Sequence, residues 1–567
     1  MFNIYFRCDL FLMKDLVLKH ALINAVEHDG KGDIQAIVKK VLSEKPELKS
    51  KIKMLLAEIK KTTKEVNSWK IEKQNKKMEE LGIEIEVKKK EEKLELPELP
   101  NAEMGKVVLR LAPFPDAPMH IGQARMIILN YYYAKKYKGK LFLVIDDTIG
   151  SGEKIIEPKA YDWIIEDLKW LGIDYDKIFY KSDRIELHYE VAESLIKKDA
   201  AYVCFCDVET LRKNREKGIK CSHRNHSIDE NLRLWKEMLD EKYPEGKATL
   251  RLKTSMSNPN PAFRDRVLCR IVKREHPRVG KKYSVWPMLE FSWAVDDYYL
   301  GITHVIRGKD LVMEDLMEDF IWNVLGWKKS IFIHYGLFTI EEIGKISKTR
   351  IRKSIVSGEY SGWDDSRTWT LMSLKKRGIQ PEAIKNFILR LGLSEADITV
   401  PVKILYSENR KLIDPIANRY FAIIDPVEIK IKDPQKVKEV RISLHPDFSE
   451  KGDRKITVNT EKIYVSSEDY KKFSGEEIGL AYLFVVKLDK TSRFISEKIP
   501  MNIQKIQWVS EPNVKIKILM PDGKIINVLA EPEIKKTKED QIIQLVRIGF
   551  CKVNKVGKET ILYFIHK

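Results

Sequence analysis

The stretch "KVVLRLAPFPDAPMHIGQARMIILNYYYAKKY", residues 106–137, most constrains what this chain can fold into. The apolar residues of "KVVLRLA" predict a short buried strand over residues 106–112. Pro113, Pro115 and Pro118 lack an N–H and fix their own φ, so they predict a stiff extended loop. Bulky apolar residues then recur at helical spacing, with lysines near the end, where the helix dipole favours them. A strand, a loop and a helix in this order predict the opening of a parallel α/β unit.

The beginning of that helix predicts an anion site. We expect the helix to begin near Met119 to Gly122. The first N–H groups of a helix have no partner within it, and they bind phosphate well. A histidine near glycine at a helix start is also common without any such role, so both interpretations stay open from this segment alone.

A second basic segment, "EEIGKISKTRIRKS", spans residues 341–354. Lys345 and Lys348 are compact cations on long stems that can reach a phosphate group, and Gly344 would let the loop close. The alternative is an ordinary solvated surface loop. The sequence contains neither G-x-x-x-x-G-K-[ST] nor G-x-G-x-x-G, so any phosphate chemistry depends on these two segments.

Cysteine spacing indicates a candidate metal site. The pattern C-x-C, fourteen residues, then C-x-H supplies three thiolates and one imidazole, which suit a closed tetrahedral zinc site. Its members are Cys204, Cys206, Cys221 and His223. Cysteine also serves as a small buried apolar residue, which is the alternative here and our expectation for Cys8, Cys269 and Cys551. Six cysteines in 567 residues do not form a disulfide scaffold, so we expect a reducing cytoplasm.

Composition favours a polyanionic partner. Lys and Arg number 102 against 84 Asp and Glu, which gives a formal charge of +18. A proteome that is basic in general would give the same balance. The opening "MFNIYFRCDLFLMKDL" is interrupted by Arg7 and Asp9, so we expect no signal peptide, and Met13 is an alternative start. No apolar run is long enough to span a bilayer, so we expect no membrane partner.

The pattern along the chain predicts several domains. Apolar residues at helical spacing come first and are followed by a linker rich in Lys and Glu. An α/β pattern follows, stops for one stretch and then resumes. Short apolar strands make up the last part of the chain, where "MPDGKI" predicts a hairpin. Asp146 and Asp147 end the second α/β strand, on the same rim as His120, unless they only terminate the strand. The predicted domains are residues 1–75 (helical), 76–104 (linker), 105–199 and 286–344 (the two α/β halves), 200–285 (an insertion), 345–399 (basic loop and helices) and 400–567 (β region).

The two basic segments resemble the two signatures of class I aminoacyl-tRNA synthetases. Together with "YAKKYKGKLFLVIDDT", "GITHVIRGKD" and "SGWDDSRTWTLMSLKKRGIQPEAI", they make nearly the whole chain resemble archaeal-type glutamyl-tRNA synthetases. The resemblance implies a multidomain α/β plus all-β fold. Its parts are a Rossmann-like catalytic domain with an acceptor-end insertion, an N-terminal helical extension and C-terminal antiparallel β-barrels that bind the anticodon. It also implies ATP-dependent activation of glutamate, Mg²⁺ on the phosphates, and the charging of glutamate tRNA. The sequence does not indicate an oligomeric state, and we take a monomer as the default.

The resemblance implies roles for individual residues. The ATP-binding positions are His120, Gly122, Gln123, Lys345, Ser347 and Lys348, of which His120, Lys345 and Lys348 are catalytic. The glutamate-binding positions are Arg110, Asp146 and Arg307. Glutaminyl-tRNA synthetase and a non-catalytic tRNA-binding paralogue are the alternatives, and charging of the glutamine isoacceptor stays open.

Five positions depart from the family pattern, namely Gln123, Ile149, Leu289, Glu290 and Leu311. Leucine cannot replace the hydroxyl of the tyrosine usual at position 289, and an added carboxylate at 290 would repel glutamate. The changes at Leu289, Glu290 and Leu311 favour the non-catalytic paralogue. Retention of the basic and histidine signature residues favours the ligase, which we take as the leading hypothesis.

Overall fold

The structure is a computed structural model that describes residues 2–27, 30–81, 95–151, 155–432 and 437–567. The chain divides into two compact units, Met1–Lys93 and Leu94–Lys567. Within the described ranges, no helix combines the length and the apolar character needed to cross a membrane.

The first unit is helical, as its periodicity predicts. Its helices are α1 (Phe2–Glu27), α2 (Ile34–Glu44), α3 (Ile52–Ser68) and α4 (Ile71–Glu80). Val17, Ile37 and Ile59 are fully buried in its core. Asp33 caps α2 by accepting the Ala36 N–H at 2.8 Å, which satisfies one of the unpaired donors at that helix start. Residues 82–94 of the predicted linker lie outside the described residues.

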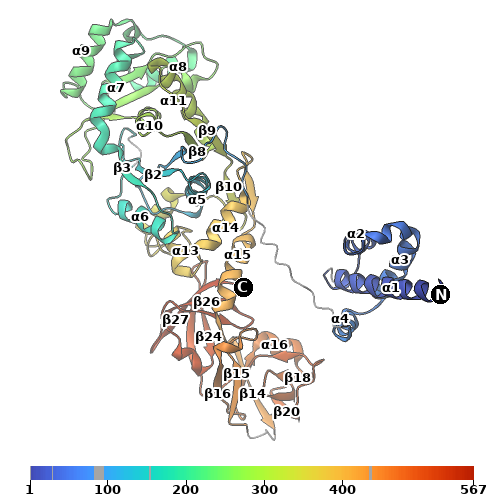
Figure 1. Cartoon of the computed structure of the whole chain (residues 1–567). Helices are drawn as coiled ribbons and strands as arrows, with labels where there is room; N and C mark the ends of the chain where they lie inside the picture. The colour runs from blue at the N-terminus through green and yellow to red at the C-terminus, as the bar shows by residue number, and fades with distance from the viewer. Residues whose placement is uncertain (1, 28–29, 82–94, 152–154, 433–436) are drawn as a thin grey trace. The chain divides into compact units, whose positions relative to one another are not determined.

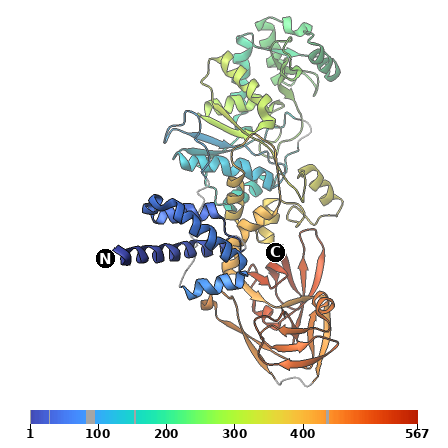
Figure 2. The same ribbon diagram turned by 90° about the vertical axis from the view of Figure 1, so that its right-hand side faces the viewer.

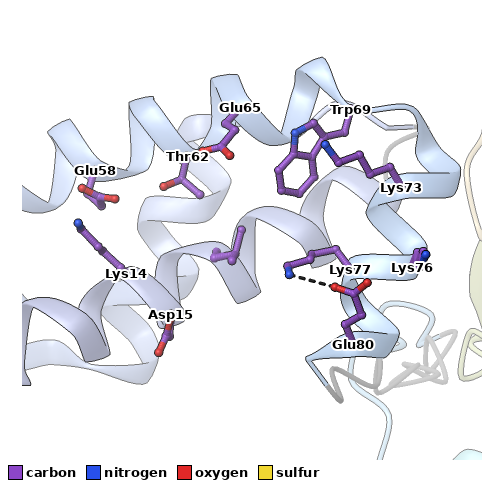
Figure 3. Close-up of a pocket in the computed structure, with 11 residues that line it drawn as sticks. Lys14, Asp15, Glu58, Thr62, Glu65, Trp69, Lys73, Lys76, Lys77 and Glu80 are labelled. Carbon is purple, nitrogen blue, oxygen red and sulfur yellow. Dashed lines mark hydrogen bonds and ion pairs between the residues drawn. The ribbon is translucent and has the colours of Figure 1, made fainter.

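A pocket of about 590 Å³ opens in this helical unit (Figure 3). Lys73 lies over the ring of Trp69 at 4.6 Å, and Lys77 pairs with Glu80 at 3.0 Å. Four lysines and four acidic residues line the pocket: Lys14, Lys73, Lys76, Lys77, Asp15, Glu58, Glu65 and Glu80. Because these charges balance, the pocket has no net attraction for an anion.

The second unit contains the predicted parallel α/β pattern (Figure 1). Strands β1, β2 and β3 form one parallel sheet and β8 and β9 another. The Thr303 N–H donates to the Val108 carbonyl at 3.0 Å and brings β8 beside β1, so the strand order is β3-β2-β1-β8-β9. The elements are β1 (Val108–Leu111), α5 (Ile121–Lys136), β2 (Lys140–Ile145), α6 (Ala160–Trp170), β3 (Lys177–Tyr180), α10 (Leu289–Tyr299), β8 (His304–Gly308), α11 (Val312–Leu325) and β9 (Ile331–Tyr335).

Between β3 and α10 the chain forms a four-stranded antiparallel sheet in the order β4-β5-β6-β7. This sheet accounts for the interruption that the sequence shows after residue 200. The elements are α7 (Ile185–Lys197), β4 (Ala201–Cys204), α8 (Val208–Lys217), α9 (Ile228–Leu239), β5 (Thr249–Leu252), β6 (Val267–Ile271) and β7 (Val285–Pro287). In both views it lies at the end of the second unit opposite to the C-terminal strands (Figures 1 and 2).

Helices follow the α/β region and continue further than the strand pattern suggests. The elements are β10 (Phe338–Ile340), α12 (Lys348–Val356), α13 (Leu371–Arg377), α14 (Pro381–Leu391), β11 (Ile398–Val400) and α15 (Lys403–Ile413). Leu405 and Ile413 of α15 are fully buried in the same core as β1 and α5. The helix therefore belongs to the packing of the α/β region, and the first C-terminal strand begins only at Asn418.

The C-terminal region consists of two seven-stranded sheets and the β15-β16 hairpin. The predicted hairpin at "MPDGKI" joins β23 and β24, with Gly523 at a φ of +85°. The sheet orders are β12-β25-β26-β27-β23-β24-β13 and β21-β18-β19-β20-β14-β17-β22. The bounds are β12 (Asn418–Tyr420), β13 (Ala422–Ile424), β14 (Pro426–Lys432), β15 (Glu439–Ser443), β16 (Asp453–Thr457), β17 (Ile463–Ser466), α16 (Ser467–Phe473), β18 (Glu477–Leu480), β19 (Phe484–Lys487), β20 (Thr491–Ser496), β21 (Lys505–Ile506), β22 (Val509–Ser510), β23 (Val514–Leu519), β24 (Ile525–Ala530), β25 (Ile542–Leu545), β26 (Gly549–Lys555) and β27 (Thr560–His566).

One detail of the predicted β region is wrong, because these sheets are mixed rather than purely antiparallel. β12 pairs with β25, β23 with β27, β14 with β20, and β18 with β21, all in parallel. Each parallel pair joins strands that are separated by other elements, since parallel neighbours need a crossover connection.

Arg125 provides a test of the contacts that fix α5 against the rest of the second unit. Its side chain is 1% exposed and donates to the carbonyl oxygens of Gly336 at 2.5 Å and Gly392 at 2.9 Å. We expect Arg125→Met to lower the free energy of unfolding of the second unit by about 2–4 kcal/mol, because buried carbonyls lose charged donors. Urea denaturation measures this loss. The exposed Lys135→Met on the same helix is the control, and equal losses in both variants would contradict the assignment.

Candidate active site

His120 is the residue before α5 and caps it. Its Nδ1 accepts the Gly122 N–H at 3.0 Å, and its own N–H donates to Gln123 Oε1 at 3.3 Å. Burial, reinforced by the nearby charge of Lys348, lowers the pKa of His120 to about 4. The ring is therefore neutral at pH 7 with its proton on Nε2, which makes Nε2 a hydrogen-bond donor. Gln123 departs from the family pattern, but its amide oxygen supplies the acceptor that this cap uses.

The proline loop before α5 is anchored on two sides. Asp167 of α6 accepts the Met119 N–H at 2.9 Å, and burial raises the pKa of this carboxyl to about 7. On the other side, Leu371 donates its N–H to the Met119 carbonyl at 2.8 Å. These contacts hold the beginning of α5 in a fixed position.

The second basic segment reaches this helix start. Gly344 has a φ of +74°, and Ser347 caps α12 by accepting the Arg350 N–H at 3.4 Å. Lys348 donates from Nζ to Asp116 Oδ1 of the proline loop at 2.7 Å, and its side chain is 14% exposed. Lys345, predicted for the same role, lies on the surface. The structure thus brings Lys348, but not Lys345, into contact with the first segment.

Two of the three predicted glutamate-binding residues lie against Trp293 of α10, and the third, Asp146, pairs with Lys181, whose Nζ lies 5.2 Å from the centre of the same ring. The guanidinium carbons of Arg110 and Arg307 lie 5.0 and 4.8 Å from its ring centre. Arg110 donates from Nε and Nη2 to the two carboxylate oxygens of Asp297, at 2.5 and 2.8 Å. A guanidinium held at two donors has a defined plane, which suits recognition of a second carboxylate.

Asp146 and Arg307 also have partners within the chain. Lys181 is fully buried and lies with Nζ 3.2 Å from Asp146 Oδ1. Arg307 donates from Nε to Asp315 at 2.8 Å and pairs through Nη1 with Glu318 at 2.8 Å. Burial raises the pKa of Glu318 to about 8, because the charged form is disfavoured away from water. Each predicted pocket residue is therefore fixed by an opposite charge or by a hydrogen bond.

Two of the departures from the family pattern have a structural explanation. Glu290 is 2% exposed and pairs with Arg266 at 2.5 Å, so its charge is compensated within the protein. Ile149 is buried in a hydrophobic cluster with Ile185 and Trp286. Nothing in the structure explains the leucines at 289 and 311.

The four residues of the predicted zinc site lie together, with their ligand atoms all within 4.8 Å of one another. The distances from Cys204 Sγ to Cys221 Sγ and from Cys206 Sγ to His223 Nδ1 are 3.8 and 3.7 Å. Arg251 donates to the sulfurs of Cys204 and Cys221, at 3.4 and 3.8 Å, which suits thiolates. Cys269 and Cys551 are buried in separate cores, and the side chain of Cys8 lies outside the described residues.

Sequence reasoning missed the residues that hold these side chains. Lys181 follows the third parallel strand at the rim that carries the other site residues, so its position was a usable signal. Asp297 belongs to the double acid of "VDD", and Asp116 stands inside the proline loop. Trp293 gives no signal, because an aromatic residue within an apolar helix usually packs in a core.

Comparison with known protein families identifies three matching regions. Residues 106–415 match the model "tRNA synthetases class I (E and Q), catalytic domain". Residues 417–505 and 505–554 match two models of the anti-codon binding domain of the same enzymes. The parallel α/β region and the two C-terminal sheets therefore correspond to the catalytic and anticodon-binding parts that the resemblance implies.

Curated relatives extend the match over nearly the whole chain. A glutamate–tRNA ligase from Pyrococcus furiosus is 42% identical over 98% of this chain and 100% of its own. Those from Archaeoglobus fulgidus and Methanothermobacter marburgensis are 40% and 39% identical with the same coverage. The chain therefore belongs to the class I tRNA synthetases of the glutamate and glutamine type, among the archaeal glutamate–tRNA ligases.

Proposed function

We propose that this chain is an ATP-dependent ligase that joins glutamate to the 3′ end of tRNA. The observation that carries the proposal is the ion pair between Lys348 and Asp116, which lies in the loop before His120 and α5. It is supported by the similarity to glutamate–tRNA ligases along 98% of the chain. We expect a cytoplasmic monomer that takes glutamate tRNA.

The first step forms glutamyl-adenylate. A glutamate α-carboxylate oxygen attacks the α-phosphorus of ATP, and the bond to the bridging oxygen of the β-phosphate breaks, so pyrophosphate leaves. ATP enters with Mg²⁺, which offsets part of the triphosphate charge. The Nε2–H of His120, at the start of α5, donates to a phosphate oxygen, whereas the first N–H groups of the helix already donate within the protein. Lys348 stabilises the negative charge that grows on pyrophosphate.

The pocket around Trp293 orients glutamate for this attack. Arg110 binds the side-chain carboxylate, because its fork of N–H groups matches two carboxylate oxygens. Asp146 binds the ammonium group, and Arg307 completes the amino-acid pocket. In the second step a ribose hydroxyl of the tRNA terminal adenosine attacks the acyl carbon, and AMP leaves.

The tRNA spans the second unit in this proposal. The insertion at residues 200–285 holds the acceptor end, and the two C-terminal sheets hold the anticodon. The net charge of +18 supplies the phosphate-directed part of the affinity, which falls with added salt.

Removal of Lys348 tests the catalytic proposal. We expect Lys348→Ala to lower the kcat of glutamate attachment to tRNA by about 10²–10³-fold, because one transition-state cation is lost. Radiolabelled glutamate and filter-bound tRNA measure this rate. Lys353→Ala removes an exposed lysine from the same helix α12 and should leave it unchanged. An unchanged rate in Lys348→Ala would contradict the assigned role.

The choice of amino acid is tested at Arg110. Arg110→Lys keeps the positive charge beside Asp297 but loses the fork, so we expect the KM for glutamate to rise about tenfold or more. Parallel assays with glutamate and glutamine establish the substrate, and circular dichroism confirms that the variant is folded. Attachment of glutamine in place of glutamate by the unmodified protein would overturn the proposal.

We propose that the cysteine cluster holds a structural zinc ion through Cys204, Cys206, Cys221 and His223. Zinc would cross-link the turn after β4 to the segment before α9, as four-ligand sites do. We expect one zinc ion per chain by mass spectrometry of the purified protein. Cys206→Ser should lower this content strongly, whereas Cys269→Ala, outside the cluster, should not. Absence of zinc from the metal-replete unmodified protein would reject the site.

A further inference from the structure

Asp116 makes two contacts with α12 from the proline loop. Its Oδ1 accepts the Lys348 Nζ–H at 2.7 Å, and its backbone carbonyl accepts from the Arg352 guanidinium. The side chain of Asp116 is 23% exposed. Two consecutive turns of α12 are thus fastened to the loop that leads into α5.

In this contact, Asp116 pairs with the same Lys348 ammonium that the proposed reaction uses. A largely buried ammonium needs a counter-ion, and within the described part of the chain Asp116 is its one salt-bridge partner within 4.0 Å. Asp167, another acid near this loop, already accepts the Met119 N–H. A triphosphate entering the site brings a second and larger negative charge to the same ammonium.

A carboxylate and a phosphate cannot both approach Lys348 without repelling each other. Either the carboxylate moves away or the phosphate binds less tightly than it would without it. We expect the segment that carries Lys348 to move relative to the loop when ATP binds, because Gly344, with a φ of +74°, stands before it and can serve as a hinge.

We propose that Asp116 is a positioning residue that holds Lys348 near the start of α5 in the absence of ATP and competes with the ATP phosphates for it. This inference rests on the proposed function. The ligand-free protein then keeps its basic segment in place, and ATP binding exchanges a carboxylate for a phosphate at one ammonium. Loss of the carboxylate would favour the phosphate, because the ligand-free state alone is weakened.

Equilibrium binding of ATP tests the exchange. The probe is ATP with Mg²⁺, titrated into the full chain by calorimetry without glutamate or tRNA. Asp116→Asn keeps the shape of the side chain and removes its charge, so we expect the Kd for ATP to fall about fivefold, the equivalent of about 1 kcal/mol. Asp116→Glu restores the carboxylate and should return the Kd toward the original value. Asp162→Asn, an exposed acid of α6, makes the same charge change and should have no effect.

Trypsin provides a second readout, which reports whether the Asp116 carboxylate holds the basic segment in the ligand-free protein and whether ATP takes over that role. We expect faster cleavage after Lys345 and Lys348 in Asp116→Asn without ATP, and protection by ATP in both proteins. An unchanged or higher Kd in Asp116→Asn would overturn the inference while the proposed function stands. Absence of ATP binding to the unmodified protein would overturn both.

Discussion

A charge that is removed from water needs an opposite charge nearby, and this requirement arranges the helices around the parallel sheet. The cations Arg110 and Arg307 project from strands, whereas their partners Asp297 and Asp315 come from α10 and α11. Each ion pair therefore fixes a helix against the strand beside it. The pocket that results is assembled from elements that are far apart in the sequence.

The fold was predictable where the information is local. Alternating strands and helices of the α/β region follow from apolar periodicity, and β2 and β8 place Asp146 and Arg307 at the same strand ends as the loop after β1. Which residue would pair with which was not predictable. Asp297 binds Arg110 across 187 residues of sequence, and no spacing rule connects them. The resemblance to a family supplied the roles of the site residues, and these roles remain predictions.

Long-range packing also explains what the sequence missed. The pairing of β23 with β27 is parallel, yet β23 alternates between buried and less buried residues as an antiparallel strand does. α15 has its own apolar stripe, but only the core around β1 and α5 makes that stripe part of the α/β region. Glu290 would disturb the pocket as an isolated carboxylate, whereas Arg266, which directly precedes β6 of the inserted sheet, compensates its charge.

In the proposed reaction, the two kinds of cation in this site meet substrate anions differently. Arg110 has five N–H donors and uses two of them on Asp297, so it can also donate to a substrate carboxylate without releasing Asp297. Lys348 is a single compact charge on a helix that follows a glycine, and a phosphate must compete there with Asp116. An arginine that binds Asp297 and the substrate carboxylate at the same time suits a pocket that has to keep one shape for one amino acid. A lysine that exchanges Asp116 for a phosphate suits a segment that has to follow a leaving group. Lys348 can return to the Asp116 carboxylate when pyrophosphate departs.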